Sequence, residues 1–210
     1  MSREGLLSDL PPVRVLGLGN LLCGDDGVGV AAVHQLLEHW QVPEDEAAIL
    51  DGGTLGMALL AHLEDAREVI LLDAVHADAP AGSFVRLEGD EVEPAVRQRL
   101  SVHQVGVADL LDALRLLGEW PERLVLLGVV PLDLDLHVGL SPEVAAALPR
   151  LEREAVDELR RAGVHPTPRL EAVPSHDDQS RKVPSSSTNA SDRVRPVPMR
   201  SRHNRANAST

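Results

Sequence analysis

Three stretches of the sequence carry side chains that could do acid–base or metal chemistry. Asp25 and Asp26 stand among glycines in the segment 17–27 (GLGNLLCGDDG), Asp73 follows an apolar run, and His103 precedes a run with helical spacing. Carboxylate and imidazole groups together suit a divalent transition metal that keeps open coordination positions. Without a metal, the same groups could act as general acid, general base and orienting residue.

Each of these residues also has an ordinary structural interpretation. An aspartate at a helix N-terminus is a common N-cap, which is the role we expect for Asp25 and which leaves Asp26 as the candidate. Asp51 and Asp73 could each stabilise a turn, and lining the same cleft as the other acids is the alternative for Asp51. A lone histidine such as His103 is often a loop residue, and the chain has nine histidines. The functional hypothesis therefore depends on the positions taken together.

Two other chemistries are possible around the first glycine-rich segment. Cys23, the only cysteine, could be a nucleophile with His103 as its base, although a small buried cysteine is the more common role. The segment 17–22 (GLGNLL) begins like a dinucleotide-binding fingerprint. Leu22 stands where the third glycine belongs, and the two acids that follow would repel a pyrophosphate, so both features argue against dinucleotide binding.

Alternating strand-like and helix-like segments must position these residues. Apolar runs predict strands at 13–19, 47–50, 68–75, 83–87 and 123–130, and helical spacing predicts helices at 28–40, 55–63, 107–117 and 141–163. Pro149 should kink or break the last helix. This alternation predicts an α/β fold, a three-layer α/β/α sandwich with a mainly parallel open sheet of about five strands. Ligands of such sheets bind at the carboxyl ends of the strands, where the candidate acids lie.

Composition limits the kind of protein this can be. The 210 residues, 43% of them hydrophobic, suffice for one globular domain. One cysteine excludes a disulfide scaffold and a zinc module built on two or more cysteines. No apolar run approaches the ~20 residues of a membrane span, and residues 1–12 lack the apolar core of a signal peptide. We therefore expect a cytoplasmic protein with no membrane partner.

The charge and composition of the chain change near residue 166. We divide the chain into an N-terminal lead (1–12), an α/β domain (13–165) and a basic Ser/Pro/Arg-rich tail (166–210) that we expect to be disordered. The tail carries a net charge of +4, whereas residues 1–165 carry −17. An acidic body repels nucleic acid, so we expect no nucleic-acid partner. We also expect a monomer.

The ordered set of motifs resembles that of the nickel–iron hydrogenase maturation endopeptidases. The matching segments are 17–30 (GLGNLLCGDDGVGV), 50–54 (LDGGT), 72–74 (LDA), 101–109 (SVHQVGVAD), 127–131 (LGVVP) and 138–142 (VGLSP). The resemblance covers about residues 13–163. It implies an α/β/α peptide hydrolase, of aspartic type by family classification, that removes a C-terminal extension from the hydrogenase large-subunit precursor after nickel insertion.

By this resemblance, Asp26, Asp73 and His103 correspond to the family's metal-contacting residues and form the predicted catalytic and metal site. The implied metal is the nickel already held by the precursor, which would serve as a recognition element. Family members often have glutamate at the position of Asp26, so this chain keeps the carboxylate but shortens its reach. Two alternatives stay open: a non-proteolytic nickel-binding chaperone module on the same fold, and a thiol hydrolase that uses Cys23.

Overall fold

The computed structural model describes residues 10–97 and 105–169. The chain divides into two units, Met1–Leu170 and Glu171–Thr210, and all described residues belong to the first. The described residues form a five-stranded sheet in the order β3-β1-β4-β6-β5, which confirms the predicted α/β class. The strands are β1 (Val13–Leu18), β3 (Ala47–Gly53), β4 (Glu68–Ala74), β6 (Arg123–Val129) and β5 (Phe84–Glu88). All pair in parallel except β5, which is antiparallel to β6.

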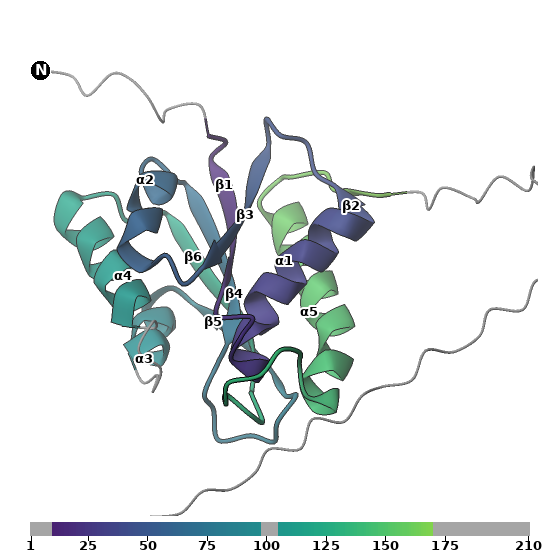
Figure 1. Ribbon diagram of the computed structural model, residues 1–210. Coiled ribbons are helices and arrows are strands. Elements are labelled where there is room, and N and C mark those ends of the chain that lie inside the picture. The colour runs from purple at the N-terminus through teal and green to yellow at the C-terminus, as the bar shows by residue number, and fades with distance from the viewer. Residues whose placement is uncertain (1–9, 98–104, 170–210) are drawn as a thin grey trace, which may run out of the picture. The chain divides into compact units, whose positions relative to one another are not determined.

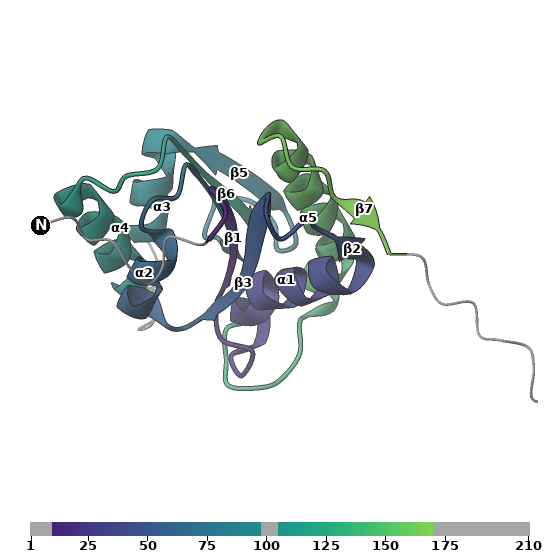
Figure 2. The same cartoon turned by 90° about the horizontal axis from the view of Figure 1, so that it is seen from above.

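Helices cover both faces of the sheet, which gives the expected three layers (Figures 1 and 2). One face carries α1 (Val28–His39) and α5 (Pro142–Arg161), and the other carries α2 (Leu60–Leu63), α3 (Val92–Arg97) and α4 (Val105–Leu117). Successive strand residues point to opposite faces of the sheet. In β4, Ile70 and Leu72 therefore join the core under α1 and α5, whereas Val69 and Leu71 join the core under α2, α3 and α4. The strands β1, β4 and β6 read as apolar runs because both of their faces are buried.

Shorter elements complete the fold. They are the 3-10 helices η1 (Gly24–Gly27), η2 (Gly56–Leu59) and η3 (Gly89–Glu91), and the antiparallel pair β2 (Trp40–Gln41) and β7 (Thr167–Pro168). The predicted helix at 55–63 is therefore a 3-10 turn, η2, that continues into α2. Neither α3 nor the β2–β7 pair is predicted by the sequence patterns. No helix within the described part of the chain is long and apolar enough to cross a membrane.

Pro149 does not break α5, although the sequence predicts either a kink or a break there. The helix runs for 20 residues through the proline. Ala147 and Leu151 are buried on either side of it, so packing against the sheet holds both halves of the helix and offsets the missing N–H group. The predicted start of this helix is confirmed, because the Val144 N–H donates to Oγ of Ser141, the N-cap, at 3.3 Å.

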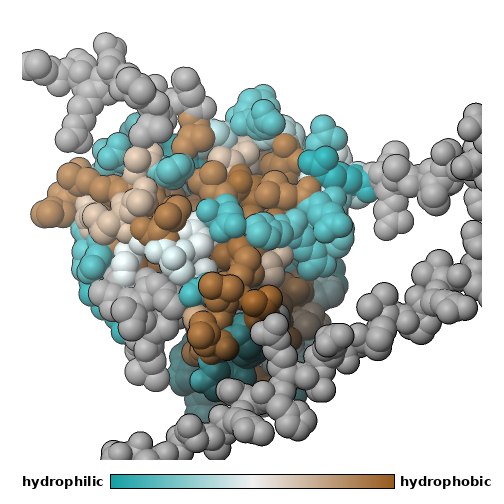
Figure 3. Space-filling model, viewed as in Figure 1, coloured by the Kyte–Doolittle hydropathy of each residue, from teal (hydrophilic) through white to brown (hydrophobic). Residues whose placement is uncertain are grey.

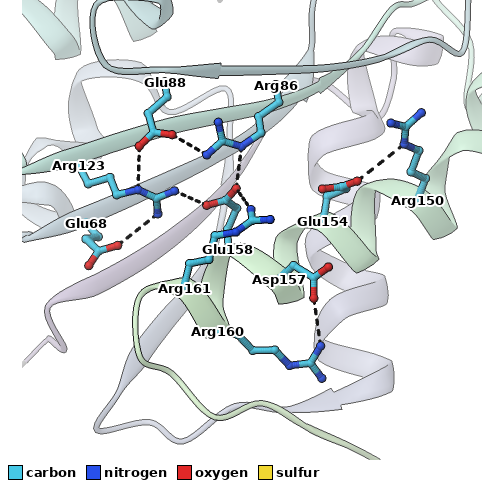
Figure 4. A network of polar contacts seen from close by, with 10 residues as sticks. All are labelled: Glu68, Arg86, Glu88, Arg123, Arg150, Glu154, Asp157, Glu158, Arg160 and Arg161. Atoms are coloured by element: carbon cyan, nitrogen blue, oxygen red, sulfur yellow. Dashed lines mark hydrogen bonds and ion pairs between the residues drawn. The ribbon is translucent and has the colours of Figure 1, made fainter.

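A fully buried carboxylate ties α5 to the edge of the sheet (Figure 4). Glu158 accepts a hydrogen bond from Arg86 Nε at 2.7 Å and is also bonded by Arg123 and Arg161. Arg86 and Arg123 pair in turn with Glu88, at 2.5 and 2.9 Å. Burial alone would raise the pKa of Glu158, but the hydrogen bonds from Arg86 and Arg123 hold that pKa below its usual range.

Candidate functional site

Glycines bring the start of α1 directly against the carboxyl ends of two central strands. A Cβ atom at Gly29 would lie 2.0 Å from the carbonyl oxygen of Leu72 and 2.5 Å from that of Leu18, so no larger residue fits. Gly19 has φ of +117°, and a Cβ atom there would lie 1.7 Å from the carbonyl oxygen of Asp26. The glycine spacing seen in the sequence therefore seats η1 against the ends of β1 and β4.

Asp26 is held at the end of β1 by backbone groups. Its side chain is buried, and its Oδ2 accepts a hydrogen bond from the Asn20 N–H at 2.8 Å. The Asp26 N–H donates to the carbonyl oxygen of Cys23 at 3.1 Å. Asn20 is fixed as well, since its Oδ1 accepts from the Leu22 N–H at 3.0 Å. The turn that follows β1 therefore sets the position of this carboxylate.

Asp73 is the second buried acid at this edge of the sheet. It is the next-to-last residue of β4 and lies opposite Gly128 of β6 in the register. The alternation along β4 places it on the face of Leu71 and Val75, which α2, α3 and α4 cover. Because η1 contacts β4, the elements that carry Asp26 and Asp73 meet at the carboxyl ends of neighbouring strands.

His103, the third predicted residue, lies outside the described residues. The next described residue, Val105, begins α4, which covers the face that Asp73 shares. Within residues 10–97 and 105–169 no group of three or more His, Cys, Asp or Glu residues could hold a metal ion. Those residues do not include His103, so a site formed by Asp26, Asp73 and His103 together stays a prediction.

Asp25 does not cap α1, contrary to the expectation from the sequence. The N-cap of α1 is Gly27, and the Asp25 carboxylate instead binds the loop 131–141, which follows β6. Its Oδ2 accepts from the N–H groups of Leu132 and Asp133 at 2.8 and 3.0 Å and from Ser141 Oγ at 2.9 Å. Its Oδ1 accepts from the Ser141 N–H at 2.6 Å.

These bonds favour the charged form of Asp25. Its burial is the largest single influence and raises the pKa, but the bonds from Ser141, Leu132 and Asp133 together hold the pKa below its usual range. Backbone bonds add to this attachment, since the N–H groups of Gly24 and Asp25 donate to the carbonyl oxygens of His137 and Asp133, both at 2.9 Å. The sequence around Asp25 does not indicate this role, because the partners of its carboxylate lie over a hundred residues away.

Two further residues from the sequence analysis lie nearby. Cys23 is half-buried, and its Sγ accepts a hydrogen bond from Asn20 Nδ2 at 3.3 Å. Asp51 contacts His34 of α1, with 2.9 Å between Oδ2 and Nε2. It also lines a cavity of about 230 Å³ together with Asn20 and Thr54. Neither Asp26 nor Asp73 lines this cavity, so the place of Asp51 in the candidate site stays a prediction.

The fold and site define an α/β/α protein with two buried carboxylates at the carboxyl ends of neighbouring parallel strands. Residues 30–158 match the family model described as hydrogenase maturation protease. The chain is 40% identical over 158 residues to the hydrogenase 2 maturation protease of Escherichia coli K12, covering 75% of this chain and 96% of that protein. It is 39% identical over 158 residues to the hydrogenase expression/formation protein HupD of Rhodobacter capsulatus, covering 74% of each chain.

Solved structures agree with these sequence matches. The E. coli hydrogenase maturating endopeptidase HybD superposes with a TM-score of 0.72 at 39% identity, covering 75% of this chain and 97% of that one. The [NiFe] hydrogenase maturation protease HybD from Thermococcus kodakarensis gives 0.59 at 28% identity, covering 70% and 98%. The chain belongs to the hydrogenase maturation protease family. It is therefore a member of a family of peptidases that process hydrogenase precursors.

Proposed function

We propose that this protein is an endopeptidase that removes the C-terminal extension of a nickel–iron hydrogenase large-subunit precursor after nickel insertion. One observation carries the proposal: in a member of this protease family, η1 and β4 bring two buried acids, Asp26 and Asp73, to one edge of the sheet. The carboxyl ends of neighbouring parallel strands are where sheets of this kind bind ligands, so two acids held there favour a chemical role.

In this proposal the metal belongs to the substrate. Asp26, Asp73 and His103 contact the nickel that the precursor already holds, and their oxygen and nitrogen donors suit divalent nickel. The metal thereby acts as a recognition element, because only a loaded precursor presents its extension to the site. A precursor without nickel lacks this attachment point and keeps its extension.

The hydrolytic step needs a water molecule and a base. In the aspartic-type reaction that we propose, the carboxylate of Asp26 or Asp73 takes a proton from water while the water oxygen bonds to the scissile carbonyl carbon. The carbon–nitrogen bond then breaks, and the proton passes to the departing amine. Activation of the water by the precursor's nickel is the other route. We propose that the enzyme acts in the cytoplasm as a monomer, with the precursor as partner and neither nucleic acid nor membrane involved.

The test is a processing assay with the cognate precursor in nickel-loaded and nickel-free forms, followed by intact mass. We expect release of one defined C-terminal peptide from the loaded form alone. Cleavage of both forms would support the peptidase activity but show that the enzyme does not use nickel to recognise its substrate. If a verified loaded precursor binds without being cleaved, the chaperone alternative replaces the endopeptidase. Inactivation by iodoacetamide that Cys23→Ala prevents would favour the thiol hydrolase.

A further inference from the structure

Exposed apolar side chains gather on the loops around the candidate site. Six large apolar side chains of the described residues are more than half exposed. Five of them lie on the loops that follow β1, β3 and β6, namely Leu22, Leu55, Leu132, Leu136 and Val138. Because the carboxyl ends of these three parallel strands lie at one edge of the sheet, so do the loops. The sixth, Leu116, lies in the last turn of α4.

This apolar surface borders the predicted active site. Figure 3 shows hydrophobic residues gathered at the lower middle of the molecule, in the region where Figure 1 draws the start of α1 and the loop after β6. The loop after β1 runs from Asn20, which binds Asp26, to η1 itself. Single exposed leucines are ordinary on protein surfaces, but a group of them on adjoining loops marks an interaction site.

The most exposed part of this surface is held in place by buried bonds. Leu136 and Val138 are 83% and 78% exposed, yet the loop 131–141 is fastened at both ends to the buried carboxylate of Asp25. His137 lies between these two residues, and its carbonyl oxygen accepts a hydrogen bond from the Gly24 N–H at 2.9 Å. The loop is therefore pre-ordered, which reduces the entropy lost when a partner binds.

The charges within the loop indicate what kind of partner it fits. The segment 132–138 (LDLDLHV) alternates apolar residues with Asp133 and Asp135, in a body whose net charge is strongly negative. A surface that mixes exposed leucines with acids complements an apolar patch flanked by lysine or arginine. A second copy of this acidic chain would place these acids against their own equivalents, which disfavours self-association.

We propose that the apolar loops around the site form the docking surface for the folded body of the precursor. This inference rests on the proposed function and adds how the substrate is held. The precursor packs an apolar, basic-rimmed patch on Leu22, Leu136 and Val138, while its extension reaches Asp26 and Asp73. Docking of the folded body supplies affinity that a short peptide around the scissile bond lacks.

The test compares two double variants of the full chain in processing the nickel-loaded precursor. Leu136→Ser with Val138→Ser removes part of the surface, and Leu116→Ser with Leu117→Ser is the control, because these leucines are also exposed but end α4. We expect the first variant to raise KM about tenfold with kcat within about twofold, since two apolar contacts are lost. The control should behave as the wild type. Unchanged KM, or an equal effect of the control, overturns the inference.

A binding measurement separates this inference from the proposed function. The precursor is titrated against the Asp26→Asn protein with and without the two loop substitutions, and against Asp26→Asn with Leu22→Ser as a variant of another loop. We expect Kd to rise in both loop variants. If the wild type does not cleave the precursor, yet precursor binding still depends on these loops, the proposed function fails and the docking surface stands. A wild-type dimer in sedimentation that Leu136→Ser and Val138→Ser abolish, with normal processing, assigns the surface to a second copy and overturns the inference.

Discussion

The carboxylate of Asp25 accepts hydrogen bonds from both the backbone N–H and the side-chain hydroxyl of Ser141, at 2.6 and 2.9 Å. Ser141 is at the same time the N-cap of α5. One buried acid next to Asp26 thus fixes the end of the loop that follows β6 and the start of the last helix. The two adjacent aspartates differ in their partners: Asp25 binds the loop 131–141, whereas Asp26 is the one for which we propose a chemical role.

We predict that Asp25→Asn loosens the loop 131–141 and impairs processing. The amide of asparagine has one acceptor oxygen, so its NH₂ group would face N–H or O–H donors that now bind the carboxylate. The cost should be about 2–3 kcal/mol, which lowers Tm by about 5–10 °C. Thermal unfolding and hydrogen exchange at Leu132 and Asp133 check this. The exposed Asp135→Asn on the same loop is the control, and equal stability of the two variants would refute the prediction.

We predict that Gly19→Ala disables the site even where the protein still folds. Gly19 has φ of +117°, and its added Cβ would collide with the carbonyl oxygen of Asp26. Displacing Asp26 by even about 1 Å should reduce processing by about a hundredfold. Gly118→Ala is the matched control, because Gly118 also has positive φ but a Cβ atom there would meet no heavy atom within 4 Å. If both variants process the precursor equally, close packing at Gly19 does not position Asp26.

We predict that Cys23→Ala retains processing within about threefold of the wild-type kcat/KM. The Sγ of Cys23 accepts a hydrogen bond from Asn20, which a methyl group cannot replace, so a small loss of stability is expected. Initial rates of peptide release and the Tm are the measurements, with Cys23→Ser as the variant that keeps a polar atom. A folded but inactive Cys23→Ala protein would favour the thiol hydrolase.

We predict that Glu158→Gln destabilises the fold in a pH-dependent way. Leaving three arginines around an uncharged amide should cost roughly 3 kcal/mol at pH 7. The folded-state pKa of Glu158 lies below the unfolded value of about 4.3, so the charged form contributes its full stability above that value. That contribution is lost as pH falls through the folded-state pKa.

The difference in free energy of unfolding between wild type and Glu158→Gln should therefore narrow when pH is lowered from 7 to below about 4. Urea unfolding at several pH values measures it. Glu154→Gln on the same helix is the control (Figure 4), since Glu154 pairs only loosely with Arg150, at 3.9 Å. A constant difference across this range would show that the charge of Glu158 is not what stabilises the fold.

Much of the fold follows from local patterns. Apolar runs locate all five strands of the sheet within a few residues. The signal is strongest for β1, β4 and β6, because these strands are buried on both faces. Gly118 and Gly163, which the sequence predicts as helix ends, have φ of +76° and +84°. The short α3 lacks a full period of apolar spacing, so the sequence does not predict it. The local effect of Pro149 predicts a kink or break, whereas packing on both sides of it decides the outcome.

The site was predictable only in part, for a related reason. Position at strand ends selects Asp26 and Asp73, because the carboxyl ends of parallel strands share one edge of the sheet. Nothing local distinguishes Asp25 from an ordinary N-cap, since its partners in the loop 131–141 come from the far end of the domain. The role of His103 stays a prediction, as does the division of the chain at residues 12 and 165.

We predict that Asp26→Asn and Asp73→Asn each reduce processing at least about a thousandfold, because each removes the charge of a carboxylate. The fold should survive, since the substitution hardly changes the volume of the side chain. Asp26→Glu should keep nickel-dependent processing at a reduced rate, since the carboxylate is retained with one more methylene. Asp78→Asn, an exposed acid after β4, is the control. Intact mass of the loaded precursor gives the activity, and circular dichroism checks the fold. Full processing by a folded Asp26→Asn or Asp73→Asn protein would remove that residue from the site, and failure of Asp26→Glu alone would show that the short aspartate is required here.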